Sequence, residues 1–332
     1  MNHLKMYSIF LCGAMSLGNT FARTIDPQTR TFLDAYCAQD IHLADISLAE
    51  FRADETLFAP EQLLSVFSFQ DISLAGNYGP FDARIYQPKK SEQPLPVLLF
   101  LHGGGWVWGS LNSHDGFCRE LCMRAQVVIV SVDYHRAPEY KFPAAINDCY
   151  AAACWVAQNA SAFGGDPSRI GVIGDSAGGN LAAAVCLMAR GQQFPQLQYQ
   201  ILMYPVLDYN FERPSYKENG AGYFLTTSNM RWFWHQYLAD IESDQCNPYA
   251  APLRSKNMQR LPPAFLLLAE FDPLRDEGLA YYKRLQEVGN DAQCKIYNTI
   301  HCFIGFGRYL AIGRLAIDDI IAYITMKMSK VN

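Results

Sequence analysis

Short apolar segments alternate with longer segments of helical spacing along most of this chain. Apolar runs without polar interruptions are typical of strands that are buried on both faces of a sheet. We expect strands at residues 81–86, 96–101, 127–132, 170–173, 201–206, 264–269 and 293–297. We expect helices at residues 143–159, 181–190 and 276–288, and a closing amphipathic helix that reaches residue 328. This alternation predicts right-handed crossovers and a mostly parallel central sheet flanked by helices, an α/β fold.

Two segments depart from this rhythm. From Asp26 to about residue 70 the pattern is helical, and Asp26-Pro27 resembles a helix cap followed by a first-turn proline. Residues 208–256 are polar and irregular and contain many aromatic side chains, so we expect a helical insertion over the sheet. Either these aromatic residues only pack against the rest of the protein, or they also line an apolar pocket.

Length and composition indicate a packed globular protein. The chain has 332 residues, and 50% of them are hydrophobic, which suits one large α/β domain or two small ones. The formal net charge of −5 at pH 7 gives no electrostatic basis for binding nucleic acid.

The first residues have the pattern of a secretory signal. Lys5 precedes a short apolar run at residues 6–17, small residues follow at Thr20-Phe21-Ala22, and no acidic residue occurs before Asp26. We therefore expect a signal peptide over residues 1–22 and export as a periplasmic or secreted protein. The alternative is an N-terminal helix that packs on the core of a cytoplasmic protein. The run is too short for a confident membrane span.

The ten cysteines do not form a recognisable metal site. Cys118 and Cys122 are four residues apart and have no partner pair with zinc-ligand spacing. Cys149, Cys154 and Cys186 fall within helical patterns, where buried cysteines act as small hydrophobic residues. Removal of the signal would leave an odd number, nine, and any disulfide pairing is left open.

The expected strand at residues 170–173 runs directly into Gly174-Asp-Ser-Ala-Gly-Gly179 and an Ala-rich helix. This strand, tight turn and helix are the context of a nucleophile elbow, in which Ser176 stands exposed at a helix N-terminus. There the backbone N–H of Ala177 can point at a developing oxyanion. The alternative is a glycine-rich turn with an ordinary serine.

A second glycine-rich turn follows the strand expected at residues 96–101, in His102-Gly-Gly-Gly-Trp106. Three glycines permit positive φ angles and close backbone approach, so the N–H groups of Gly104 and Gly105 can complete an oxyanion hole. The spacing matches neither a dinucleotide-binding turn nor a P-loop. We expect His102 to orient this loop and not to act as a base.

Two further candidates follow expected strands in the order Ser, Asp, His. Asp272 comes just after the strand at residues 264–269, and His301 follows the strand at 293–297. The carboxyl ends of parallel strands share one edge of a sheet, so these residues can meet Ser176 there. An imidazole takes the serine proton, and a carboxylate fixes the tautomer of the imidazole. Asp276 is a rival carboxylate farther from the strand end, and Asp272 could instead be a turn or helix cap.

Together these motifs resemble the hormone-sensitive-lipase-like family of α/β-hydrolase esterases, and the resemblance covers nearly all residues from 25 onward. It rests on His102-Gly-Gly-Gly-Trp, Gly174-Asp-Ser-Ala-Gly-Gly, Asp272-Pro-Leu-Arg-Asp-Glu and His301-x-Phe303. The resemblance implies that Ser176 is the nucleophile, Asp272 the acid and His301 the base, with oxyanion donors Gly104, Gly105 and Ala177.

The resemblance also implies one α/β-hydrolase domain over residues 23–332. Its cap would come from about 23–75 and 208–256, and its catalytic core from about 76–207 and 257–332. One departure from the family is Tyr134-His-Arg-Ala-Pro-Glu139, where the usual sequence is Tyr-Arg-Leu-Ala-Pro-Glu. This segment is structural in the family, so the change puts local packing in doubt and not the chemistry.

The function implied is a serine carboxylesterase that hydrolyses short- to medium-chain esters through an acyl-enzyme on Ser176, with no metal or organic cofactor. The expected partner is a small-molecule ester, and a homodimer is left open. An amidase or deacetylase would use the same three residues. The family also contains non-catalytic hormone receptors that have lost the histidine, and His301 argues against that function here.

Overall fold

The computed structural model describes residues 23–37, 40, 42–53, 58 and 62–328, so the expected signal peptide lies outside the described residues. These residues contain an eight-stranded sheet of order β1-β2-β4-β3-β5-β6-β7-β8. Its strands are β1 (Ser68–Gly76), β2 (Gly79–Gln87), β3 (Leu95–Leu101), β4 (Val128–Asp133), β5 (Gly165–Asp175), β6 (Tyr199–Met203), β7 (Ala264–Phe271) and β8 (Ala292–Ile300). Strand β2 runs opposite to all the other strands, and every pair without β2 is parallel. The predicted mostly parallel α/β sheet is therefore confirmed.

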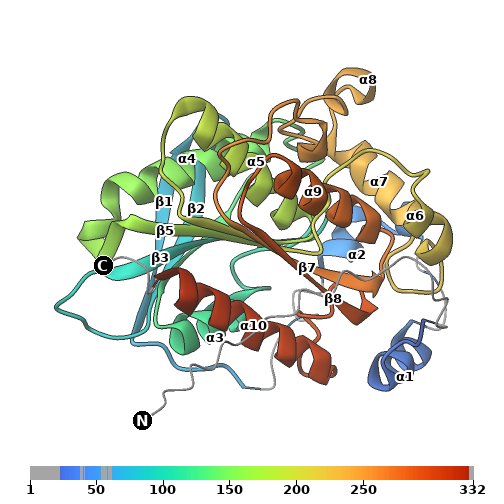
Figure 1. Cartoon of the computed structure of the whole chain (residues 1–332), viewed down its shortest axis with the longest axis horizontal. Coiled ribbons are helices and arrows are strands. Elements are labelled where there is room, and N and C mark those ends of the chain that lie inside the picture. Colours follow the sequence, from blue (N-terminus) through green and yellow to red (C-terminus); the bar gives the residue numbers. More distant parts are fainter. Residues whose placement is uncertain (1–22, 38–39, 41, 54–57, 59–61, 329–332) are drawn as a thin grey trace, which may run out of the picture.

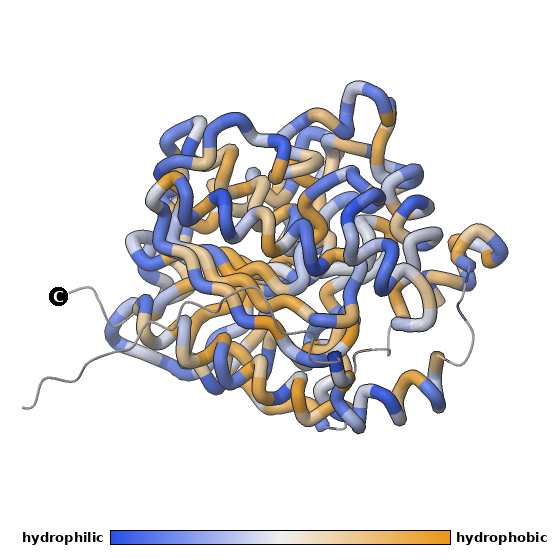
Figure 2. Tube along the Cα trace, turned by 45° about the vertical axis from the view of Figure 1, so that its right-hand side comes forward, coloured by the Kyte–Doolittle hydropathy of each residue, from blue (hydrophilic) through white to orange (hydrophobic). Residues whose placement is uncertain are grey.

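Helices cover both faces of this sheet (Figure 1). One face carries α4 (Ala144–Asn159), α5 (Ala177–Gln192) and α9 (Arg275–Glu287), and the other carries α3 (Asp115–Ala125) and α10 (Ala311–Met328). Strands β3 and β4 and residues 170–175 of β5 are therefore buried almost throughout, which explains why their sequences do not alternate between polar and apolar. Figure 2 shows the resulting band of hydrophobic residues through the middle of the molecule.

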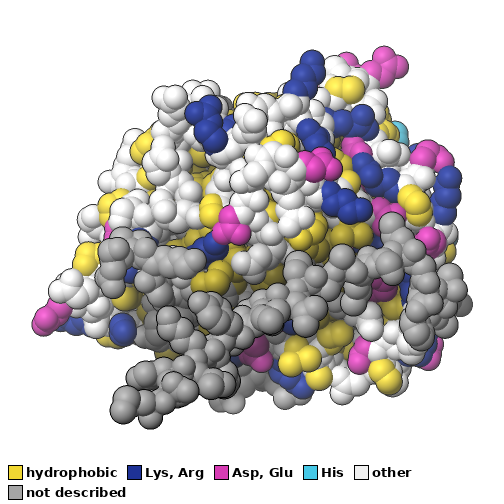
Figure 3. Space-filling view, in the orientation of Figure 1, with side chains coloured by type: hydrophobic (Ala, Val, Ile, Leu, Met, Phe, Trp, Pro, Cys, Tyr) yellow, Lys and Arg dark blue, Asp and Glu magenta, His cyan; other side chains and the backbone are white. Residues whose placement is uncertain are grey.

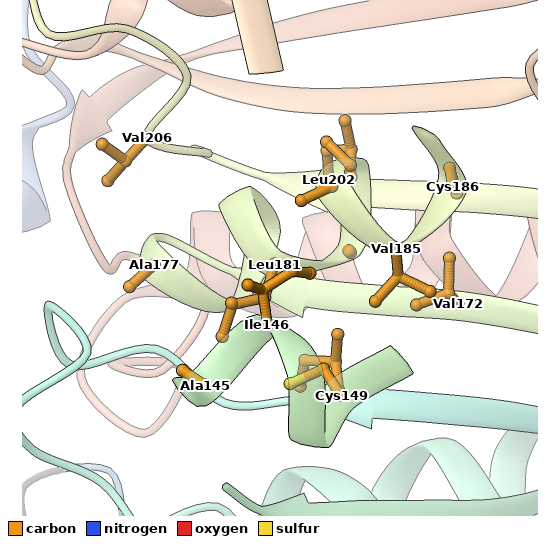
Figure 4. Close-up of a cluster of buried hydrophobic side chains, with 14 of the residues drawn as sticks. Ala145, Ile146, Cys149, Val172, Ala177, Leu181, Val185, Cys186, Leu202 and Val206 are labelled. Atoms are coloured by element: carbon orange, nitrogen blue, oxygen red, sulfur yellow. The ribbon is translucent and has the colours of Figure 1, made fainter. Parts of the chain in front are cut away.

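Cysteines contribute to the core between α4, α5 and the sheet (Figure 4). Cys149 of α4 and Cys186 of α5 lie among aliphatic side chains such as Val172 and Leu181. Burial raises the pKa of both thiols, which keeps them neutral. The interpretation of these two cysteines as small hydrophobic residues is confirmed, whereas Cys154 is only partly buried; every described cysteine is a free thiol.

Two separate segments form a cap beside the carboxyl ends of the strands (Figure 1). The first holds α1 (Pro27–Tyr36), a 3-10 turn (Leu43–Asp45) and α2 (Leu48–Ala53), and the second holds α6 (Pro214–Asn219), α7 (Thr227–Tyr237), α8 (Ile241–Asp244) and a 3-10 turn (Pro252–Arg254). The side chain of Asp26 accepts from the Thr29 N–H, as the predicted helix cap requires. The segments touch each other, because the Leu43 N–H donates to the Asn229 side chain.

The structure differs from the sequence expectations at two strands. Residues 68–76 form β1 and not a continuation of the helical segment, so the sheet begins earlier than the boundary expected near residue 76. This edge strand is mostly exposed, and Phe69 faces solvent, so its apolar pattern was weak. Strand β6 ends at Met203 and not at residue 206, because Tyr204 turns the chain with a positive φ of 37°.

On the face in Figure 3, basic and acidic side chains are interspersed. Among the described helices, none is both long enough and apolar enough to cross a bilayer.

Two glycines of α5 allow a test of how tightly this helix packs against the sheet. A Cβ on Gly178 would lie 1.9 Å from the carbonyl oxygen of Leu101, whereas the nearest neighbour at Gly191 is 4.0 Å away. We expect Gly178→Ala to destabilise the protein by about 3 kcal/mol or more, because the backbone must move. Gly191→Ala should stabilise it by about 0.5–1 kcal/mol through helix propensity. Urea unfolding of both variants measures the difference, and equal stabilities would contradict this packing.

Candidate active site

The turn between β5 and α5 consists of a single residue, Ser176. Its φ of 53° and ψ of −116° are costly for a residue with a side chain. Hydrogen bonds hold it on both sides, because its N–H donates to Met203 O at 2.9 Å and its carbonyl accepts from the Val206 N–H at 3.2 Å. A backbone conformation this strained persists only where the surroundings fix it. The predicted strand, turn and helix around Ser176 are therefore present.

The structure brings together the three side chains that the sequence predicts. Ser176 Oγ lies 2.9 Å from His301 Nε2, and His301 Nδ1 lies 2.7 Å from Asp272 Oδ2. His301 and Asp272 are 2% and 1% exposed, and Ser176 is 7% exposed. Because a carboxylate only accepts, Nδ1 carries the proton and Nε2 is free to accept from the serine hydroxyl. This is the geometry in which an imidazole can take the proton of a nucleophile.

The carboxylate of Asp272 determines the electrostatics of this chain of hydrogen bonds. Burial alone lowers the pKa of His301, but the charge of Asp272 and the neighbouring Cys302 thiol outweigh it and hold this pKa well above its usual value. The Asp272 Oδ1 atom accepts from the Leu274 N–H at 2.8 Å, which fixes the carboxylate. Asp272 can therefore stabilise the imidazolium that forms during proton transfer.

The rival carboxylate, Asp276, has other partners. It accepts from the Ser215 N–H and forms an ion pair with Arg275 at 2.9 Å. Asp276 lies in the first turn of α9, where a negative charge also interacts favourably with the helix dipole. The geometry favours Asp272 over Asp276 as the partner of His301.

Tight packing and a helix N-terminus specify the backbone at Gly104, Gly105 and Ala177, the predicted oxyanion donors. Gly104 and Gly105 have φ angles of 106° and 61°, which favour glycine. A Cβ on Gly104 would lie 2.2 Å from Trp108 O, and one on Gly105 would lie 2.1 Å from the ring of Phe233 in α7. Ala177 begins α5, where a backbone N–H has no partner within the helix.

His102 is suited to orienting this loop. Its Nδ1 lies 2.8 Å from Gly103 O, so Nδ1 carries a proton that it donates to the loop. Complete burial lowers the pKa of His102 to about 3, so the ring is neutral. Its face stacks on Tyr134 at 4.2 Å between ring centroids. These contacts fit the expected orienting role.

Comparisons with known proteins identify the family of this chain. A family model described as the alpha/beta hydrolase fold matches residues 98–305. The carboxylesterase NlhH of Mycobacterium tuberculosis is 36% identical over 287 residues, which cover 85% of this chain and 89% of the relative. The arylesterase of Saccharolobus solfataricus is 34% identical over 293 residues, covering 86% and 94%. The chain belongs to the hormone-sensitive-lipase-like α/β-hydrolases. A solved hyperthermophilic esterase from the archaeon Pyrobaculum calidifontis superposes with a TM-score of 0.85 and 38% identity, covering 91% of this chain and 98% of that one.

The segment in which this α/β-hydrolase departs from its family supports the loop at residues 102–109, here called the oxyanion loop after its predicted role. The Tyr134 hydroxyl donates to His102 O at 2.8 Å, Arg136 donates to Gly109 O at 2.6 Å, and the Ala137 N–H donates to Trp106 O at 2.9 Å. Arg136 is one of the two departing residues, and the other, His135, is anchored on Asp148, whose Oδ2 lies 2.6 Å from His135 Nδ1. The pair of His135 and Asp148 therefore explains how the altered segment packs.

Sequence reasoning missed further contacts around the site. Arg52 of α2 donates to Val107 O and Ala137 O and pairs with Glu139, which ties the cap to the oxyanion loop. The Cys302 thiol contacts the His301 imidazole, and Cys302 has a positive φ of 62°. The only sequence feature that pointed to the contact of Cys302 was its position next to His301. No sequence feature pointed to the contacts of Arg52.

The two cysteines whose spacing was examined for a zinc site are buried in the structure. Cys118 and Cys122 are both buried within α3. No cluster of three or more His, Cys, Asp or Glu side chains that could hold a metal ion occurs in the part of the chain that the structure describes.

The two carboxylates after β7 allow a matched test of the assignment. Asp272→Asn should lower kcat by about 10⁴-fold, because the amide no longer enforces the imidazole tautomer that accepts the serine proton. Asp276→Asn removes a charge four residues away without touching His301, so its kcat should stay within about threefold of the wild type. Steady-state kinetics on an activated acetate ester measure both variants. A larger loss in Asp276→Asn would assign the acid to the rival position.

Proposed function

We propose that this protein is a serine carboxylesterase that cleaves short- to medium-chain carboxylic esters through an acyl-enzyme on Ser176. The observation that carries the proposal is the hydrogen-bond chain from Ser176 Oγ through His301 to Asp272. It is supported by the names of the relatives, which include a carboxylesterase, an arylesterase and an ethyl acetate hydrolase from Pseudomonas putida.

The proposed reaction has two halves. His301 Nε2 takes the proton from Ser176 Oγ as this oxygen attacks the ester carbonyl, and the N–H groups of Gly104, Gly105 and Ala177 stabilise the oxyanion. Collapse of the tetrahedral intermediate breaks the ester C–O bond, and the imidazolium gives its proton to the departing alcohol. Water then attacks the acyl-enzyme with His301 again as the base, and the acid leaves as Ser176 recovers its proton.

The size preference rests on how closely the cap meets the oxyanion loop. Phe233 of α7 contacts Gly105 directly, and its ring centroid lies 5.9 Å from that of Phe51 in α2. Aromatic side chains from both cap segments therefore limit the space beside the reacting carbon. We infer that these rings bound an apolar pocket for the acyl chain, which favours chains that fill it and rejects longer ones. Amides meet the same groups, and no described residue favours them over esters.

Covalent labelling tests the nucleophile directly. A fluorophosphonate probe should form one adduct on Ser176, and Ser176→Ala should abolish labelling and lower kcat by at least about 10⁴-fold with little change in stability. Ser228→Ala is a matched control, because Ser228 lies in the cap helix α7 and has no contact with the triad residues. Mass spectrometry locates the adduct. An adduct on another serine, retained in Ser176→Ala, would overturn the assignment.

A p-nitrophenyl ester series tests the chain length. Each methylene that enters an apolar pocket gains about 0.8 kcal/mol, and the gain reverses when the next one meets the packed wall. We expect kcat/KM to rise from acetate, peak at about four to eight carbons and collapse for palmitate. Phe233→Ala should move the peak to longer chains. Undiminished hydrolysis of emulsified long-chain triacylglycerol would contradict the short-chain preference.

A further inference from the structure

The carboxylate next to the proposed nucleophile, Asp175, contacts the oxyanion loop. Asp175 Oδ1 accepts from the Gly103 N–H at 2.8 Å, and Asp175 is 5% exposed. The approach is so close that a Cβ on Gly103 would lie 2.3 Å from Asp175 Oδ2. One side chain therefore ties the end of β5, which carries Ser176, to the loop that carries Gly104.

A second imidazole lies behind this carboxylate. His114 Nε2 is 3.6 Å from Asp175 Oδ2, an electrostatic contact slightly longer than a hydrogen bond, and His114 Nδ1 is 2.8 Å from Ser113 Oγ. The ring is 5% exposed and packs between Phe58 and Phe100, each at 5.5 Å between centroids. His114 also precedes the first turn of α3, so the start of a helix fixes its backbone.

The charge of Asp175 is retained despite its burial. Burial by itself raises the pKa of this carboxyl, but the contact with His114 and the hydrogen bond from the Gly103 N–H hold the pKa below its usual value. A buried polar pair of this kind contributes little net stability compared with well-packed apolar residues, and its best-attested use is to specify one geometry. The geometry specified here is that of the oxyanion loop.

We propose that His114 is a positioning residue for the oxyanion hole, which acts by orienting the Asp175 carboxylate toward Gly103. This inference rests on the esterase function proposed above. His114 touches neither the ester nor Ser176. It keeps one oxygen of Asp175 on the Gly103 N–H, so that the next two N–H groups of the loop face the position where the oxyanion forms. Loss of this orientation should slow the chemical step without weakening ground-state binding.

The surroundings of His114 make the inference testable by substitution. His114 and Asp175 line a cavity of about 370 Å³ between α3 and α10, together with Phe117, Tyr204 and Ile317. A side chain of similar size can therefore replace the imidazole without displacing a fully packed core. His114→Phe keeps the aromatic packing and removes both nitrogens. His114→Gln places an amide N–H near the position of Nε2.

The experiment compares these two variants with a control, Asp115→Asn. Asp115 starts α3 and binds Tyr86 and Arg119, so its substitution disturbs the same helix end without touching Asp175. We expect His114→Phe to lower kcat on p-nitrophenyl butyrate by about 10- to 100-fold with KM within twofold. His114→Gln and Asp115→Asn should retain kcat within about threefold.

An oxyanion-forming inhibitor supplies a readout that a purely structural role would not move. A trifluoromethyl ketone adds to Ser176 and places a negative oxygen in the hole, so its Ki should rise in His114→Phe by the same factor as kcat falls. Unchanged kcat and Ki in His114→Phe would overturn the inference. Equal losses in all three variants, parallel to a fall in Tm, would also overturn it. An inactive wild type would instead refute the proposed esterase function.

Discussion

The approach of the α5 backbone to the backbones of β5 and β3, with no side chain between them, is the constraint on which the rest of the structure depends. A Cβ on Gly174 or Gly178 would come within 2.2 Å or 1.9 Å of backbone atoms. Because the helix can lie this close, the chain reverses within the single residue Ser176. The N-terminus of α5, with its unpaired N–H groups and positive dipole end, therefore stands beside the serine oxygen. Strain at Ser176 is the cost of this arrangement.

The second half of the proposed oxyanion hole, the loop at residues 102–109, is supported in a different way. Residues 102–109 form no helix or strand, so side chains from other elements must hold them in place. Tyr134 and Arg136 support the loop from the segment after β4, and Asp175 supports it from the elbow. A site assembled from one rigid element and one braced loop depends on contacts that extend well beyond the reacting groups.

The sequence predicted the parts of this protein that a strong local pattern specifies. Strands buried on both faces gave apolar runs, and the edge strand β1 was missed because most of its residues face solvent. Ser176, Asp272 and His301 could be named because the chemistry demands these residue types after strand ends, and the structure brings them together; their roles stay predictions. The contacts of Arg52 and His114 depend on residues far away in the chain, and no local pattern encodes such long-range packing.

The hydrogen bonds from Arg52 of α2 to the oxyanion loop and the segment after β4 constrain how the sequence of this protein can evolve. Arg52 donates to the carbonyls of Val107 and Ala137, so the cap and the proposed oxyanion hole share a contact. Residues in contact do not change independently. A lineage that reshapes the cap to accept a new ester should pass through slower intermediates. Its compensating substitutions should then accumulate in residues 102–109 and 134–139, while the three residues of the hydrogen-bond chain stay fixed.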